Sequence, residues 1–163
     1  MTTQFSKQYH TRPSLHSSRY IYLSWALWEQ RLGNISNARR LLERGHDLNR
    51  TDAALLQAWA ILEGREGDLQ LARELFEKAV AVDASHLYVW QAWGVLEFRS
   101  GNLPRARELF QRGVWADPNS PSVALVFQAW AVLERSAGDY QSARALFKCA
   151  VKADSRSSPS WMV

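Results

Sequence analysis

Apolar and polar positions follow each other along this chain at helical spacing, and the pattern is interrupted at regular intervals. The stretch from Trp59 to Glu77 contains two runs with apolar residues three and four positions apart, on either side of the pair Gly67-Asp68. Apolar residues at this spacing occupy one face of a helix. Glycine readily adopts the left-handed backbone conformation found where helices end. The stretch therefore predicts two helices that fold back on each other.

This hairpin pattern occurs four times, and each copy carries the same residues at fixed offsets. The tryptophans are separated by 34, 34 and 37 residues, and a Glu and an Arg follow each of them. The three columns are Trp25, Trp59, Trp93 and Trp130; Glu29, Glu63, Glu97 and Glu134; and Arg39, Arg73, Arg107 and Arg144. A period near 34 residues is typical of stacked helical hairpins. We therefore predict an all-α fold, a right-handed α-solenoid.

The repeats set the expected boundaries. We predict repeats at about 19–50, 51–84, 85–118 and 119–155, a truncated fifth at 156–163, and a flexible, acid-poor segment at 1–18. Predicted helices run over about Ser18–Leu32, Ile35–Leu48, Ala53–Glu66, Leu69–Val82, Ser85–Ser100, after the turn Gly101-Asn102 with Pro104 in the first helical turn, from Ser120-Pro121 onward, and Tyr140–Ala153. Three extra residues between Pro118 and Trp130 are expected to lengthen the loop or the first helical turn. Apolar residues at 161–163 indicate that the array continues, because terminal repeats need a polar outer face.

The repeated columns have a structural interpretation. The tryptophans lie on the same helical face as Ala or Gly and Leu, so we assign them to the core, where each indole anchors its own hairpin. The alternative is an aromatic platform for stacking bases. Glu and Arg lie ten residues apart in every copy, for example Glu63 and Arg73. Across a tight turn this spacing predicts an ion pair within each hairpin, a structural role rather than a ligand site.

Two further columns are candidates for ligand binding. Arg31, Arg65 and Arg99 follow the tryptophan by six residues, and Gln57, Gln91 and Gln128 precede it by two. The first helices of such hairpins commonly line a concave surface. There the arginines could contact phosphates and the glutamines base edges of a single strand. Alternatively, both residue types are simply good helix formers on a wet face. A further basic column, Arg44, Lys78 and Arg112, is expected to be solvated.

Composition excludes several function classes. The chain has 163 residues and a net charge of +4, and Cys149 is its single cysteine. No apolar run reaches the roughly 18–20 residues that a membrane span needs. The four histidines do not fall at metal-ligand spacing, and no phosphate loop, nucleophile elbow or paired carboxylates occur. We therefore predict no enzymatic activity, no metal, no cofactor and no small-molecule substrate.

The pattern W-A-x-L-E-x-x-x-G-x-x-x-x-A-R-x-L-F, with Asp117-Pro118 near a repeat end, resembles the half-a-TPR (HAT) repeat. The resemblance covers about Tyr20 to Trp161. Within that group, residues 40–49 and 89–97 are similar to the chloroplast factors of the PsbB mRNA maturation family. Two departures are the short array and the absence of Pro at the ends of the other repeats.

The HAT resemblance implies a role in RNA processing or mRNA stabilisation. The expected partner is single-stranded RNA held along a concave groove, and the expected location is the chloroplast, or alternatively the nucleus. The acid-poor first 18 residues are compatible with organelle import. A competing hypothesis from a different class is a protein–protein interaction scaffold within an RNA-processing complex, in which the same groove holds a peptide. A catalytic role has no candidate residues.

Overall fold

The structure, a computed structural model, describes residues 15–155, and the predicted fifth repeat and residues 1–14 lie outside this range. Within it the chain is helical throughout, without strands. The helices are α1 (Leu15–Arg31), α2 (Ile35–Leu48), α3 (Ala53–Glu66), α4 (Leu69–Val82), α5 (Leu87–Arg99), α6 (Leu103–Ala116), α7 (Val123–Ser136) and α8 (Tyr140–Ser155). The bounds of α2, α3 and α4 are those predicted, whereas α1 begins three residues before Ser18. The all-α prediction is confirmed.

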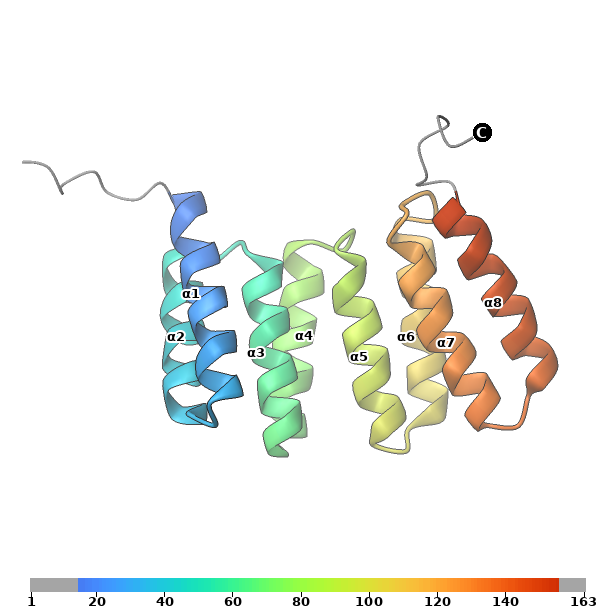
Figure 1. Cartoon of the computed structure of the whole chain (residues 1–163), viewed down its shortest axis with the longest axis horizontal. Coiled ribbons are helices and arrows are strands. Elements are labelled where there is room, and N and C mark those ends of the chain that lie inside the picture. The colour runs from blue at the N-terminus through green and yellow to red at the C-terminus, as the bar shows by residue number, and fades with distance from the viewer. Residues whose placement is uncertain (1–14, 156–163) are drawn as a thin grey trace, which may run out of the picture. The chain divides into compact units, whose positions relative to one another are not determined.

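The chain divides into two compact units, at residues 1–50 and 51–163. The first holds the hairpin α1–α2, and the second holds the hairpins α3–α4, α5–α6 and α7–α8. Within the second unit, α5 packs against α3 and α4, and α7 packs against α5 and α6. Consecutive helices run in opposite directions, and in Figure 1 α4 lies behind α3 and α6 lies behind α7. Each hairpin of this unit therefore buries one face against the next hairpin, as in a helical-repeat array.

Every hairpin makes the same turn between its two helices. The glycine after the first helix has a φ of +80° at Gly33, +98° at Gly67, +82° at Gly101 and +86° at Gly138. The next amide N–H, for example that of Asp68, donates to the carbonyl of the repeated glutamate, here Glu63, over 3.0 Å. This bond satisfies a carbonyl that the helix end leaves without an intrahelical donor. The glutamate backbone therefore closes the turn, while its side chain remains available for other contacts.

A polar side chain caps the start of the second helix in the hairpins α3–α4 and α5–α6. Asp68 accepts from the amide of Leu71 over 3.0 Å, and Asn102 accepts from that of Arg105 over 3.3 Å. Such caps satisfy amide N–H groups that have no partner within the helix.

The loop before α7 spans residues 117–122, compared with 83–86 before α5, and α7 also begins one residue further from its tryptophan. The three extra residues thus lengthen both the loop and the first turn.

The core of the second unit is built from fully buried side chains of both helix types. It includes Leu75 and Phe76 of α4, Trp93 of α5, and Leu109 and Phe110 of α6. The rings of Phe76 and Trp93 stack at 5.9 Å between centroids, across the junction between hairpins. Because a single hairpin cannot cover these rings alone, the apolar face of one hairpin is completed by the next.

At Gly94, α5 packs directly against the Phe110 ring of α6. A Cβ atom at this position would lie 2.3 Å from Cε1 of Phe110, whose side chain is fully buried. We expect Gly94→Ala to lower the free energy of unfolding, since overpacking costs about 1–3 kcal/mol against a gain in helix propensity of at most about 1 kcal/mol. Urea denaturation measures the difference. Adding Phe110→Leu should recover stability, and a more stable Gly94→Ala chain would contradict the close packing.

Candidate functional site

The repeated tryptophan and glutamate of each hairpin contact each other directly. Their spacing of four residues places both side chains on one helical face. The indole Nε1 donates to a glutamate Oε1 over 3.0 Å in Trp25–Glu29, 2.9 Å in Trp59–Glu63, 3.3 Å in Trp93–Glu97 and 2.9 Å in Trp130–Glu134. A buried indole N–H needs an acceptor. The glutamate supplies it in all four hairpins.

Within the second unit, Arg73 and Arg107 each pair with the glutamate of the following hairpin. Nε and Nη2 of Arg73 donate to the two carboxylate oxygens of Glu97 over 2.7 and 2.9 Å. Arg107 contacts Glu134 in the same way, over 2.8 and 2.7 Å. The predicted pairing within a hairpin is therefore wrong for these arginines. Ala72, which directly precedes Arg73, packs against α3 of its own hairpin. The next residue along a helix points roughly 100° away, so Arg73 faces the following hairpin instead.

These bidentate pairs lie at the junctions between hairpins, and their carboxylates are shielded from water. The side chain of Glu97 is 1% exposed and that of Glu134 is 7% exposed, whereas Arg73 and Arg107 remain partly exposed. The Arg73 guanidinium, followed by the Trp93 N–H, holds the pKa of Glu97 below its ordinary value, although burial opposes this shift. Arg107 and Trp130 lower the pKa of Glu134 in the same way. Both glutamates are thus held as buried carboxylates.

The first hairpin satisfies its glutamate with residues of its own. Glu29 accepts from Trp25 Nε1 through one oxygen and from Asn34 Nδ2 over 2.8 Å through the other. These contacts lower its pKa, with Asn34 making the largest contribution. Asn34 therefore performs within this hairpin the role that Arg73 and Arg107 perform across junctions. The sequence signal was present, because Asn34 directly follows the turn glycine, but its side chain was assigned no role.

The assignment of the repeated tryptophans to the core is confirmed for three of them and wrong for the fourth. Trp93 is 3% exposed, and Trp59 and Trp130 are half-buried, so these three pack in or against the core. Trp25 is 50% exposed, and its assignment to the core is wrong. Its indole N–H is nevertheless bound to Glu29. The four tryptophans therefore share one polar contact but differ in the surface that covers their rings.

The second unit brings three of the six predicted ligand-binding residues to one groove. Arg65, Arg99 and Gln91 line an open cavity of about 500 Å³ between α3 and α5, which we call the α3–α5 groove. Its apolar lining comes from Ile61, Phe76, Ala92, Val95 and Leu96. Arg65 and Arg99 are exposed. The groove thus combines an apolar floor with two cationic side chains near one end of each helix.

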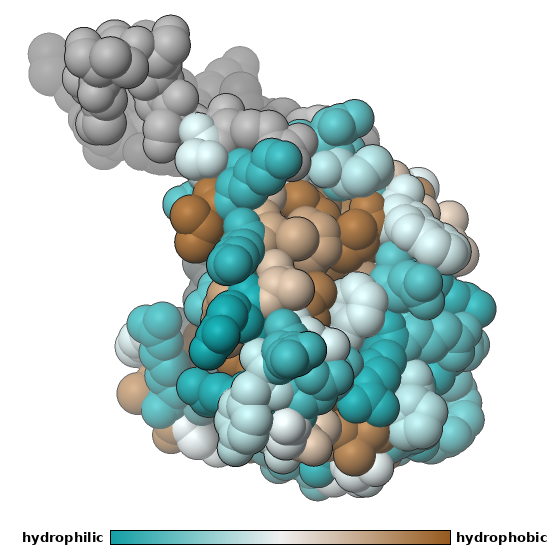
Figure 2. Space-filling view, turned by 90° about the vertical axis from the view of Figure 1, so that its right-hand side faces the viewer, coloured by the Kyte–Doolittle hydropathy of each residue, from teal (hydrophilic) through white to brown (hydrophobic). Residues whose placement is uncertain are grey.

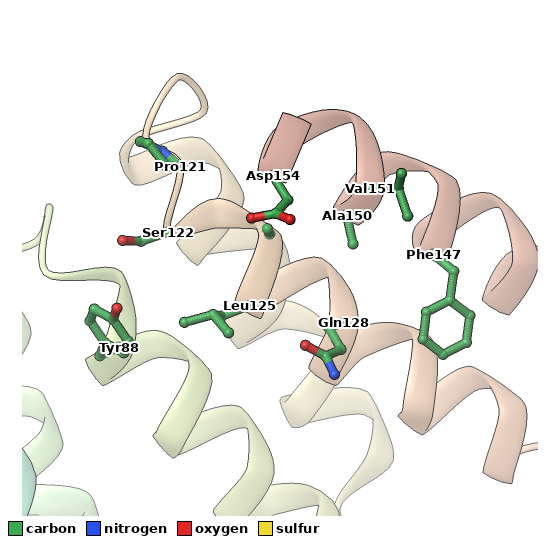
Figure 3. A pocket seen from close by; sticks show the side chains of 10 residues that line it. Tyr88, Pro121, Ser122, Leu125, Gln128, Phe147, Ala150, Val151 and Asp154 are labelled. Atoms are coloured by element: carbon green, nitrogen blue, oxygen red, sulfur yellow. The ribbon is translucent and has the colours of Figure 1, made fainter. Parts of the chain in front are cut away.

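The other predicted residues lie elsewhere. Arg31 is exposed at the end of α1 in the first unit. Gln57 donates to the carbonyl of Tyr88 over 3.4 Å and bonds with the His86 ring over 3.0 Å, so its amide is engaged in structural contacts. Gln128 lines a second hollow of about 530 Å³ beside α7 and α8. Figure 3 shows this hollow, with Leu125 and Gln128 on α7 and Phe147, Ala150 and Val151 on α8.

The apolar floor of the groove was not identified from the sequence. Ile61, Val95 and Val132 each follow the repeated tryptophan by two residues, so an apolar column lies beside the arginine and glutamine columns. These residues are half-buried and read as ordinary helix positions. Their recurrence at the position between two polar columns was the available signal. Among residues 15–155, no group of His, Cys, Asp or Glu has metal-binding geometry.

A comparison with protein-family models finds a match in the middle of the chain. Residues 57–121 match the tetratricopeptide repeat family model. Among curated proteins, none matches the chain in sequence. The match begins within α3, covers most of that helix, and ends in the loop before α7, so it includes the parts of α3 and α5 that line the α3–α5 groove.

Solved structures agree on the tetratricopeptide-like fold. PilF of Pseudomonas aeruginosa is 20% identical with a TM-score of 0.73, over 90% of this chain and 65% of that chain. MamA is 16% identical with a TM-score of 0.65, over 85% and 79%. A chain of the APC/C hetero-tetramer Cut9–Hcn1 is 21% identical with a TM-score of 0.65, over 85% and 26%. This chain therefore spans only about two thirds of PilF, and these likenesses establish the fold.

The buried pairs predict how stability depends on pH. Since the pKa values of Glu97 and Glu134 are lowered on folding, their contribution is complete above the unfolded value of about 4.3 and is lost as pH falls through the folded values. We expect the double variant Glu97→Gln and Glu134→Gln to lose stability at pH 7, by about 1–3 kcal/mol for each site. Its loss of stability between pH 5 and 3 should be smaller than that of the wild type.

Urea denaturation at several pH values measures both effects. Glu77→Gln, on the exposed face of α4, serves as the matched control and should follow the wild-type profile. If the double variant and the wild type lose stability in parallel on acidification, the buried carboxylates do not act as the structure indicates.

Proposed function

We propose that this chain is a protein-interaction scaffold that binds an extended segment of a partner protein in the α3–α5 groove. The observation that carries the proposal is the composition of the groove: an apolar floor flanked by two exposed arginines and one glutamine. Pockets of this kind bury apolar side chains of a ligand and orient it with a few polar groups. A segment with an apolar residue next to a carboxylate fits this arrangement.

The apolar residues of the groove favour a peptide over a nucleic acid. Ile61, Val95 and Leu96 offer aliphatic surface to a side chain. Single-stranded RNA is usually held by exposed aromatic rings on which bases stack. The aromatic residue that lines this groove, Phe76, is 1% exposed and stacks with Trp93. Its face is therefore unavailable to a base.

The arginines favour an acidic ligand. A guanidinium group binds a carboxylate through two parallel hydrogen bonds, as Arg73 and Arg107 already do inside this chain. Arg65 and Arg99 lie in the same position of consecutive repeats and both line the groove. We propose that they bind carboxylates of the partner, while Gln91 contacts its backbone.

RNA binding is the second candidate function. The exposed Arg65 and Arg99 and the net charge of +4 favour it, and the HAT resemblance implies it. In that reading the same arginines contact phosphates, and a chloroplast location is part of the proposal. In either reading the chain acts by binding, and we propose no catalytic step.

A selection experiment tests the peptide proposal. A random displayed peptide library is selected on the immobilised full chain, and enriched peptides are titrated against the chain by fluorescence anisotropy. We expect enriched sequences to combine acidic and apolar residues. The double variant Arg65→Ala and Arg99→Ala should weaken binding by about tenfold or more, because both carboxylate contacts are lost. A largely apolar contact should weaken only modestly as salt rises.

The control removes the same charge from another face of the chain. Lys78→Ala with Arg112→Ala changes two exposed cations of α4 and α6 and should leave peptide affinity unchanged. A labelled single-stranded RNA is titrated in parallel at two salt concentrations. Saturable RNA binding that falls steeply with salt and is lost in Arg65→Ala with Arg99→Ala would replace the peptide proposal. Selection that enriches no acidic and apolar sequence would contradict it.

A further inference from the structure

Apolar surface is open at two kinds of place in the second unit. One is the α8 side of the molecule, where Figure 2 shows apolar surface bordered by hydrophilic side chains. Because α8 belongs to the last hairpin that the structure describes and the chain continues beyond it, we assign no site there. The other is the α3–α5 groove, which lies between two hairpins that both belong to this unit. Its opening therefore has to be explained by the residues that line it.

One residue distinguishes the two junctions at which the first helices of this unit meet. These junctions join α3 to α5 and α5 to α7. The position five residues after the repeated tryptophan is Gly64 in α3 and Phe98 in α5. Phe98 is half-buried and packs against the core, whereas Gly64 lines the groove. The chain thus places an aromatic ring at one junction and no side chain at the other.

The missing side chain leaves a leucine of the following hairpin uncovered. Leu96 and Leu133 each follow the repeated tryptophan by three residues. Leu133, at the junction that carries Phe98, is 0% exposed, whereas Leu96 is half-buried and lines the groove. A Cβ atom at residue 64 would lie 2.6 Å from Cδ1 of Leu96. Position 64 is therefore in direct contact with the groove floor, and its lack of a side chain keeps that floor open.

Neither the backbone nor the packing requires a glycine at this position. Gly64 lies inside α3 and does not have a positive φ. At Gly94 a Cβ atom would meet the ring of Phe110, which is fully buried and cannot move aside. At Gly64 it would meet the terminal methyl group of a half-buried leucine, which a change of rotamer moves away. Glycine also weakens the interior of a helix relative to alanine. The fold therefore does not account for this glycine.

The surroundings of Gly64 define the chemistry of a side chain that fills the space. The chain itself has a phenylalanine at the corresponding position of α5, so a ring of this size fits between two first helices of the array. Arg65 follows Gly64 directly, and Arg99 lines the same groove. A guanidinium group packs favourably on an aromatic face, as Arg105 does on Trp93 at 5.2 Å from the ring centroid. An aromatic residue next to a carboxylate therefore satisfies both the apolar floor and the arginines.

From these observations we propose that Gly64 makes the α3–α5 groove selective for a partner segment that carries an aromatic residue beside an acidic one. The ring packs on Leu96, in the space that position 64 leaves open, and the carboxylate binds Arg65 or Arg99. This inference rests on the proposed function, and it narrows the bound residue from an apolar one to an aromatic one. It assigns the selectivity to the position at which the two junctions differ.

Methyl NMR spectroscopy of the full chain tests the contact directly. The probes are three peptides with blocked ends and the sequence Gly-Glu-X-Glu-Gly, in which X is Phe, Leu or Ala. Each peptide is titrated into the chain labelled at its leucine methyl groups. We expect the Phe peptide to bind at least about tenfold more tightly than the Ala peptide, because it buries a whole ring, with the Leu peptide between them. Only the Phe peptide should shift the Leu96 methyl resonances through its ring current.

Filling the groove from within is the second measurement. Gly64→Phe copies the residue of the next repeat and should weaken binding of the Phe peptide at least about tenfold while keeping both arginines. Gly64→Ala, which displaces only the end of the Leu96 side chain, should weaken binding less. The matched control Arg135→Phe places the same residue at the same position of α7, outside the groove, and should bind as the wild type does. Both Gly64 variants should fold, because each replaces a glycine inside a helix, and circular dichroism checks this.

The outcomes separate this inference from the proposed function. Equal affinities for the Phe and Ala peptides, or unchanged binding by a folded Gly64→Phe chain, would overturn the inference. If Arg65→Ala with Arg99→Ala still weakens binding of those peptides, the proposed function stands without it. Failure of all three peptides to bind the wild type would also overturn the inference, while the library selection decides the proposed function on its own.

Discussion

The second unit depends on placing a glutamate carboxylate at each junction between hairpins without leaving its charge unpaired. Burying an unpaired carboxylate costs several kcal/mol, so the group must be matched by a cation or by several donors. Here the arginine of the preceding hairpin and the tryptophan of the same helix supply three hydrogen bonds to Glu97. Because the arginine fork accepts a carboxylate in one geometry, this contact fixes how α5 sits on α4.

The same glutamate links local structure to packing. Its backbone carbonyl closes the glycine turn, its side chain orients the indole, and its charge binds the previous hairpin. Aromatic packing then fills the space around it, with Phe76 stacked on Trp93. Because α5 docks in this register, an apolar space remains between α3 and α5. This space is the α3–α5 groove. The candidate binding site is therefore a consequence of the junction geometry.

The period and the turn glycines predicted the fold because both report local geometry. They located α2, α3 and α4 to the residue. They could not identify the partner of Arg73, because a helical period gives the face of a residue and not the neighbour on that face. For the same reason, the arginine and glutamine columns were correctly placed on the first helices, while the engagement of Gln57 by His86 and the apolar floor of Ile61 and Val95 emerged only from the packing.

The central claim, that an Arg–Glu pair with a buried carboxylate couples consecutive hairpins, is tested most directly by a double-mutant cycle. Arg107→Met, Glu134→Gln and the double variant are compared with the wild type by urea denaturation at neutral pH. The structure predicts a coupling energy within the range of about 0.5–3 kcal/mol seen for contacting residues. Additive effects of the two substitutions would contradict the claim, and would mean that apolar packing alone sets the register of the hairpins.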